Sequence, residues 1–168
     1  MGYSGPAVSD GKIYFADRSL AKGAANPNSP FERAEVTGNE RLLCLDEKTG
    51  KTLWAHSYDS NYRISYAAGP RCTPTVDGEL VYFLGAMGDL WCLETKSGKV
   101  VWEKHFLKDF KAQLPVWGFA SHPLVDGDKL ICYVGGDEGR TVVAFDKKTG
   151  KELDTRQISL AFMGKDNP

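Results

Sequence analysis

The sequence lacks the features that mark several large functional classes. Its basic and acidic residues nearly balance, with a formal net charge of -1 over 168 residues, so we expect no broad attraction to nucleic acid or anionic lipid. No apolar run approaches the roughly 20 residues of a membrane-spanning helix. The opening stretch, "MGYSGPAVSDGKIYF", has neither the basic start nor the apolar core of a signal peptide.

Cysteine is sparse and scattered, and neither a CxxC pair nor two adjacent cysteines occur. This spacing argues against zinc and thioredoxin-type chemistry, and we expect no metal. Asp137 and Glu138, within "GGDEGR", could offer oxygen ligands to calcium, but a solvated turn is the simpler interpretation. Cys44 and Cys92 stand at equivalent positions of a repeat and are expected to be small buried core residues.

What the sequence does contain is a repeat. "DEKTGKTLW" at 46–54 returns as "ETKSGKVVW" at 94–102 and as "DKKTGKELD" at 146–154, a period of about 50 residues. Upstream of each copy, a proline-led run reaches an apolar run through Asp-Gly, as in "PAVSDGKIYF", "PTVDGELVYF" and "PLVDGDKLICYV". Asp-Gly between apolar runs predicts a hairpin, because both residues tolerate positive φ.

Each repeat contains four short runs rich in β-branched and aromatic residues. In the second repeat these are "CTPTV", "LVYFLG", "DLWCLE" and "VVWEKHF". The middle two lack strict alternation, which indicates a sheet covered on both faces. The sequence therefore predicts an all-β protein: a β-propeller of four-stranded antiparallel blades, with repeats at 1–68, 69–119 and 120–158 of one partial propeller spanning 1–168.

The repeated motif, Ala-x-Asp-x-x-Thr-Gly-x-x-x-Trp, resembles the tryptophan-docking repeat of quinoprotein-type propellers. That family includes pyrroloquinoline quinone (PQQ) dehydrogenases and a non-catalytic outer-membrane assembly lipoprotein. Cys44 and Cys92 fill the Ala position in the first two copies and Ala144 fills it in the third, where Asp154 replaces the tryptophan. The motif residues expected to be structural are Asp46, Thr49, Gly50, Trp54, Glu94, Ser97, Gly98, Trp102, Asp146, Thr149 and Gly150.

The chemistry of the motif explains its spacing. Asp and Thr can hydrogen-bond the backbone of a tight turn that glycine permits, and the indole four residues later can lie on a neighbouring turn. Residues repeated around a ring cannot all form one active site, so we expect no catalytic residue among them.

Candidate binding residues lie where the sequence does not repeat. The irregular segments are 17–40, 58–71 and 107–121, all expected on the face opposite the Asp-Gly and Thr-Gly turns. On this face Trp117 and Phe119 could stack on a ligand, and Arg71 and His122 could bind an anion or transfer protons. Each has a plainer structural interpretation, as a packed aromatic or a hydrogen-bonded side chain.

The family's dehydrogenases hold PQQ with an adjacent cysteine pair, a tryptophan platform and calcium ligands, and this pattern is not recognisable here. We therefore expect no cofactor, and a binding or scaffolding module whose protein or small-molecule ligand is unknown. The alternative is part of a PQQ-dependent alcohol or sugar dehydrogenase. The resemblance implies a periplasmic or extracellular location and a ring of about seven or eight blades. Three blades leave apolar faces uncovered, so we expect self-association or a longer propeller.

Overall fold

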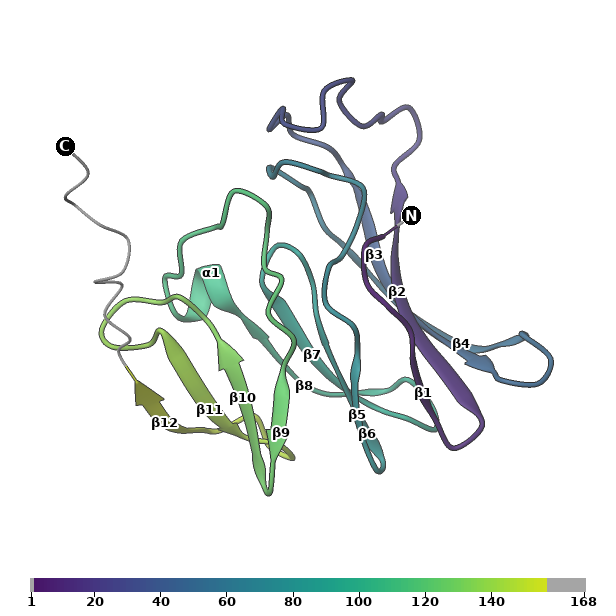
Figure 1. Ribbon diagram of the computed structural model, residues 1–168, viewed down its shortest axis with the longest axis vertical. Coiled ribbons are helices and arrows are strands. Elements are labelled where there is room, and N and C mark those ends of the chain that lie inside the picture. The colour runs from purple at the N-terminus through teal and green to yellow at the C-terminus, as the bar shows by residue number, and fades with distance from the viewer. Residues whose placement is uncertain (1, 157–168) are drawn as a thin grey trace.

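Three four-stranded antiparallel sheets stand side by side in the computed structural model, which describes residues 2–156 (Figure 1). The first sheet, blade 1, contains β1 (Ala7–Ser9), β2 (Lys12–Leu20), β3 (Gly38–Asp46) and β4 (Thr52–Asp59). Blade 2 contains β5 (Thr75–Asp77), β6 (Leu80–Leu84), β7 (Asp89–Glu94) and β8 (Val100–His105). Blade 3 contains β9 (Leu124–Asp126), β10 (Lys129–Tyr133), β11 (Val142–Asp146) and β12 (Glu152–Arg156).

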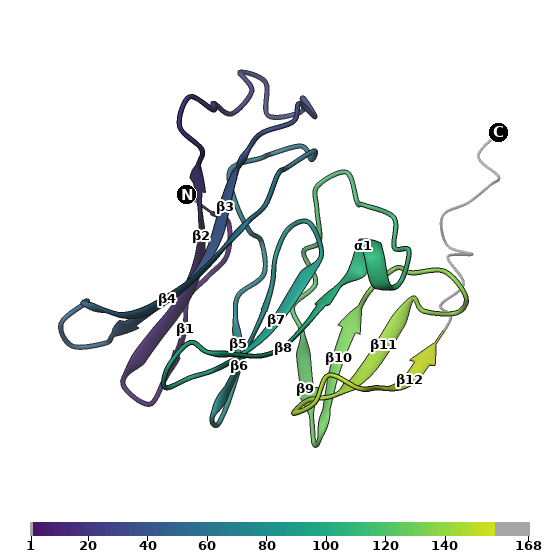
Figure 2. The same ribbon diagram turned by 180° about the vertical axis from the view of Figure 1, so that it is seen from behind.

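Within each blade the strands pair in sequence order, which is the meander expected of a propeller blade. The first hairpin shows why: Asp10 and Gly11 have φ of 48° and 70°, the left-handed pair that a two-residue hairpin requires. Figure 2 shows the same fan of blades from behind. The predicted all-β propeller class is confirmed. The end of the third repeat, at 157–158, and the "SLAFMGKDNP" segment lie outside the described residues.

The core consists of two layers, one between each pair of neighbouring blades. Between blades 1 and 2, Tyr14, Leu42 and Cys44 meet Phe83 and Leu93. Between blades 2 and 3, side chains of the other faces pack together, including Tyr82, Leu90, Trp102, Leu130 and Phe145. Blade 2 is thus covered on both faces, and this explains why Val81, Tyr82, Phe83 and Leu84 are buried one after another without alternation.

The outer blades each leave one face uncovered by another blade. On β10, Leu130 and Cys132 are buried against blade 2, whereas Tyr133 is exposed. On blade 1, Phe15 and Leu43 pair across β2 and β3 and are only partly buried. Strand alternation turns them away from blade 2.

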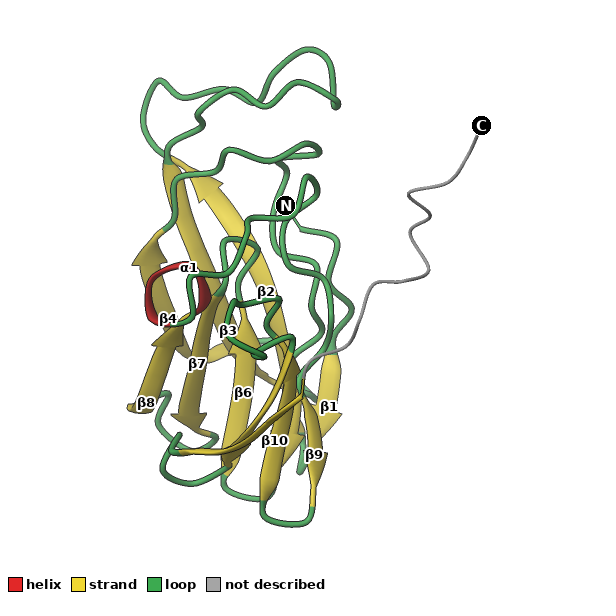
Figure 3. Cartoon of the chain, turned by 90° about the vertical axis from the view of Figure 1, so that its left-hand side faces the viewer, coloured by secondary structure: helices red, strands yellow, loops and turns green. Residues whose placement is uncertain are grey.

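The connections between strands differ in length at the two ends of the blades. Short hairpin turns gather at one end and the long connections at the other, as Figure 3 shows. The expected loops at 17–40 and 58–71 are shorter than predicted, because β2 runs to Leu20, β3 begins at Gly38 and β4 ends at Asp59.

A one-turn helix, α1 (Phe106–Asp109), begins at the edge of the segment expected to be a loop. Phe106 is buried in the core, and the Asp109 carboxylate accepts a hydrogen bond from the His105 backbone N–H at 2.8 Å. A side chain that closes back on the first turn stabilises a helix too short to show any periodicity. No helix within residues 2–156 is long and apolar enough to cross a membrane.

Candidate functional site

The motif turns are built alike in all three blades. In blade 1, Asp46 Oδ1 accepts hydrogen bonds from the backbone N–H of Thr49 at 2.8 Å and from its hydroxyl at 2.6 Å. Asp146 and Thr149 repeat both contacts, and in blade 2 the Ser97 hydroxyl donates to Glu94 Oε2 at 2.6 Å. The hydroxyl and N–H of Thr49 lower the pKa of Asp46. These exposed turns are hydrogen-bonded to themselves.

Each motif tryptophan lies on the motif turn of the next blade. Trp54 Nε1 donates to the Thr95 carbonyl at 3.0 Å, and Trp102 Nε1 donates to the Lys147 carbonyl at 3.1 Å. A Cβ added to Gly98 would stand 2.6 Å from Trp54 Cε3, and one added to Gly150 would stand 2.7 Å from Trp102 Cδ2. The glycines therefore leave room for an indole as well as taking positive φ.

Asp154 takes the tryptophan position in blade 3. It pairs with Ala144 across β11 and β12, just as Trp54 pairs with Cys44 and Trp102 with Cys92. Asp154 is exposed, and its Oδ1 accepts the Thr155 backbone N–H at 2.9 Å. In blade 3 this position thus makes a hydrogen bond within its own strand, whereas in the first two blades an indole at this position contacts the next blade.

The opposite end of the blades forms what we call the loop face. It consists of the segments 21–37, 60–74, 85–88, 106–123 and 134–141, which connect the strands listed above. Of the two aromatic residues expected there, Trp117 is 63% exposed, whereas Phe119 is 3% exposed and packs edge-on against Phe106 at 5.5 Å. Only Trp117 is therefore available to a ligand.

Arg71 and His122 both make structural contacts. The Arg71 guanidinium donates to the carbonyls of Gly69, Ser65 and Tyr66, the last two at 3.0 and 2.6 Å. His122 Nδ1 accepts the Thr73 backbone N–H at 2.8 Å. The Thr73 hydroxyl in turn accepts the Gly5 N–H at 3.1 Å. Gly5, Thr73 and His122 each precede the proline before the first strand of their blade. These two hydrogen bonds therefore link blade 1 to blade 2 and blade 2 to blade 3 in the same way.

Three exposed apolar side chains of the loop face, together with that of Tyr3 in the segment before β1, form a set that we call the loop patch. Its members are Tyr3, Phe31, Val116 and Trp117. Ser65 ties two of their segments together, because its hydroxyl donates to the Phe31 carbonyl at 3.0 Å and its N–H donates to the Val116 carbonyl at 2.9 Å. The Arg71 guanidinium, bonded to the Ser65 carbonyl, lies 5.3 Å from the Tyr3 ring.

Beneath the loop patch lies a buried carboxylate that the sequence reasoning missed. Glu40 on β3 is fully buried and accepts hydrogen bonds from the hydroxyls of Tyr58 and Tyr62 and from the Ala86 N–H at 3.0 Å. Burial raises its pKa, although these three donors oppose the shift. A side chain at Gly85 would overlap the Tyr58 hydroxyl and the Glu40 carboxylate, so glycine is required there.

Arg18 faces Glu40 across the β2–β3 pair and is also buried. Its Nη2 donates to the carbonyls of Val36 at 2.6 Å and Ser60 at 3.2 Å, and its guanidinium lies 3.9 Å from the Tyr62 ring centroid. This buried network fixes the segments on either side of the loop patch. One sequence signal could have found this network, because alternate residues of a strand point to the same face. Arg18 therefore lies on the same face of β2 as the core residues Tyr14 and Ala16. Glu40 lies on the same face of β3 as Leu42 and Cys44.

The described residues do not fit a quinone–calcium pair. Asp137 lies 3.8 Å from Lys111 Nζ and Glu138 lies 2.9 Å from Arg140, so each is already paired with a cation. Within residues 2–156 no three His, Cys, Asp or Glu side chains converge as metal ligands. The four cysteines, all in this range, are buried free thiols, and burial raises the pKa of Cys72 and Cys92 to about 12.

Side-by-side four-stranded blades with interblade cores define the class: this chain is part of a β-propeller. A family model described as "Outer membrane protein assembly factor BamB" matches residues 38–159. The chain belongs to this family of PQQ-like repeat propellers.

Its relatives include both enzymes and assembly factors. The chain is 34% identical over 139 residues to the quinoprotein ethanol dehydrogenase of Pseudomonas aeruginosa, covering 76% of the chain and 21% of that enzyme. It is 27% identical over 145 residues to the outer membrane protein assembly factor BamB of Salmonella typhimurium, covering 80% of the chain and 32% of that protein. The chain thus spans less than a third of the length of these relatives.

A solved structure supports the fold alone. The quinohemoprotein alcohol dehydrogenase of Comamonas testosteroni matches with a TM-score of 0.56 and 20% identity, covering 90% of this chain and 20% of that one.

Proposed function

We propose that the chain is a binding or scaffolding module that recognises a partner protein through the loop face. The observation that carries this is the loop patch: Phe31 is 67% exposed and Trp117 63%, yet both stand on segments fixed by hydrogen bonds. Aromatic side chains and arginine are enriched at protein interfaces, and exposed apolar clusters mark interaction sites. Trp117 is the expected anchor of the interface.

The alternative is a segment of a PQQ-dependent alcohol or sugar dehydrogenase, favoured by the identity to the ethanol dehydrogenase. Against it stand the ion pairs of Asp137 and Glu138 and the buried, free thiols among the described residues. Under the binding proposal the chain needs no cofactor. A periplasmic or extracellular location is part of the proposal and is supported by the kinship with an outer membrane assembly factor.

Site-specific photocrosslinking tests the binding proposal. A benzoylphenylalanine replaces Trp117 in one variant and, as a matched control, Leu153, which is 48% exposed on β12 away from the loop face. Irradiation of cells that express each variant should join position 117, and not 153, to one defined protein that mass spectrometry identifies. Equal adducts at both positions, or none at 117, would contradict recognition through the loop patch.

A further inference from the structure

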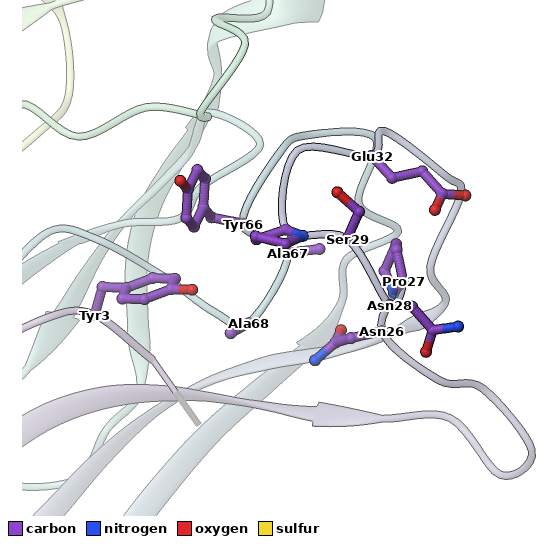
Figure 4. Close-up of a pocket in the computed structure, with 10 residues that line it drawn as sticks. Tyr3, Asn26, Pro27, Asn28, Ser29, Glu32, Tyr66, Ala67 and Ala68 are labelled. Carbon is purple, nitrogen blue, oxygen red and sulfur yellow. The ribbon is translucent and has the colours of Figure 1, made fainter.

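A small pocket opens on the loop face beside the loop patch (Figure 4). It has a volume of about 130 Å³ and is formed by the 26–32 segment, the 66–68 segment and Tyr3. Figure 4 shows the rings of Tyr3 and Tyr66 on one side and Asn26 and Asn28 on the other, with the Asn26 amide directed towards the rings and the Asn28 amide directed away from them. The walls are therefore largely aromatic and proline rings, with the hydrogen-bonding amide of Asn26 on one side.

The backbone of Tyr66 is held in an unfavourable conformation at this pocket. Its φ is 55°, a left-handed value that is rare for a bulky side chain. The strain is fixed by hydrogen bonds: Tyr66 N–H donates to the Pro30 carbonyl at 2.6 Å, and the Tyr66 carbonyl accepts from Ala68 N–H at 2.8 Å and from Arg71 Nη2 at 2.6 Å. Strain maintained in this way gathers at functional sites. Here it sets the position of the Tyr66 ring.

The size and lining of the pocket limit what it can take. Pockets for whole small molecules usually measure about 300 to 1,000 Å³, so this pocket suits a single ring or side chain. Its flat walls come from Tyr3, Tyr66, Pro27 and Pro30, and its amides from Asn26 and Asn28. A proline ring packs well on aromatic faces and brings no N–H that would need an acceptor. The carbonyls of an extended proline-containing strand are unpaired and can accept from the amides.

The pocket is continuous with the loop patch. Tyr66, one of its walls, meets Phe31 of the loop patch edge-on at a centroid distance of 5.4 Å. A chain with one residue in the pocket can therefore continue over Phe31 toward Val116 and Trp117, whose segment is tied to that of Phe31 through Ser65. A partner protein segment uses both surfaces, whereas a sugar of the size of the pocket uses only one.

We propose that this pocket receives a proline residue of an extended partner segment, and that the rest of the segment crosses the loop patch. The inference rests on the proposed binding function and adds the chemistry of the partner. It uses the mode by which proline-rich segments dock on aromatic-lined grooves.

Peptide titration followed by NMR tests this inference directly. The probe is the hexapeptide Pro-Pro-Leu-Pro-Pro-Leu, compared with a matched peptide in which alanine replaces every proline, and with cellotriose. The proline peptide should saturate the chain and shift the side-chain amide signals of Asn26 and Asn28, and the alanine peptide should bind at least about tenfold more weakly. Equal binding of the two peptides, or saturation by cellotriose alone, would overturn the proposal.

Variants separate the pocket from the fold. Tyr66→Gly deletes the ring and still tolerates the positive φ, so it should weaken the proline peptide at least about tenfold. Tyr3→Ala should also weaken binding of the proline peptide, and this second variant tests the pocket if Tyr66→Gly does not fold. Tyr133→Ala, an exposed tyrosine on blade 3, should leave affinity unchanged. Unchanged affinity in both pocket variants would refute the site.

The two proposals fail in distinguishable ways. A partner crosslinked at position 117 together with no proline-peptide binding would reject only the proline pocket. Absence of both would reject the loop face as a binding surface.

Discussion

At the scale of single residues, a tryptophan and a glycine from neighbouring blades act as one unit. Gly98 takes positive φ and at the same time leaves the space into which Trp54 fits, and Gly150 does the same for Trp102. The indole N–H groups of both tryptophans are satisfied by carbonyls of that next blade. In the first two blades the motif therefore links the blade to the next one as well as shaping its own turn.

Replacing Trp54 or Trp102 with Ala should lower the free energy of unfolding by about 3 to 5 kcal/mol, the usual effect of emptying a large aromatic site. Trp117→Ala is the control: its ring is exposed on the loop face, and the change should stay within about 0.5 kcal/mol. Chemical denaturation of the three variants measures this. If both motif variants unfolded like the parent, docking through these indoles would contribute nothing to stability.

The buried Glu40 makes stability depend on pH. Burial raises its pKa in the folded state above the ordinary value, so protonated Glu40 is favoured by folding. The stability that Glu40 contributes is fully present below the pKa of the unfolded state, about 4.3, and is lost as pH rises through the pKa of the folded state. Glu40→Gln, which mimics the protonated acid, should match the parent at low pH and become relatively more stable as pH rises.

Unfolding free energies of the two proteins across the acidic to neutral range provide the measurement. A parent that gained stability relative to Glu40→Gln as pH rose would show that the tyrosine hydroxyls and the Ala86 N–H outweigh burial.

At the scale of elements, the strands and hairpins could be predicted from the sequence because their signals are local. Asp-Gly at 10–11 and the apolar runs that flank it give the first hairpin directly. The helix at 106–109 could not be predicted, because a single turn has no periodicity and depends on the buried Phe106.

Less of the candidate site than of the fold could be read from local sequence signals. The loop face follows from the strand order, but which loop side chains are exposed depends on packing between distant segments. Phe119 turns into the core against Phe106, and Arg71 is occupied by three carbonyls. The Glu40 network joins β3, β4 and two loops, contacts that no short stretch of sequence reveals.

At the scale of the whole molecule, blades 1 and 3 leave opposite faces uncovered, so the free face of blade 3 could pack on the free face of blade 1 of another copy. We call the face of a blade that carries the motif tryptophan position its motif face. At each existing interface the motif face of one blade packs against the opposite face of the next blade. Blade 3 leaves a motif face with exposed Leu124 and Tyr133, and blade 1 leaves the opposite face with Phe15 and Leu43. Burying such area contributes roughly 25 cal/mol per Å².

We therefore expect copies of the chain to associate head to tail in solution. Light scattering coupled to size exclusion should show species larger than 18.5 kDa. Ile131 pairs with Leu124 and Ala144 on the free face of blade 3, and Ile131→Glu should shift these species toward the monomer. Trp117→Ala, on the loop face, should leave the distribution unchanged. A monodisperse, cooperatively unfolding monomer of the parent would rule out this association.

The choice between a binding module and a dehydrogenase is the central functional question, and turnover decides it most directly. The purified chain is supplied with PQQ, calcium, alcohols or sugars and an artificial electron acceptor, and dye reduction is compared with that of free quinone. Because Asp137 and Glu138 are each paired with a cation and the four cysteines are buried and free, we expect no reduction above the free-quinone rate. Calcium-dependent reduction well above that rate would contradict the binding module and favour the dehydrogenase.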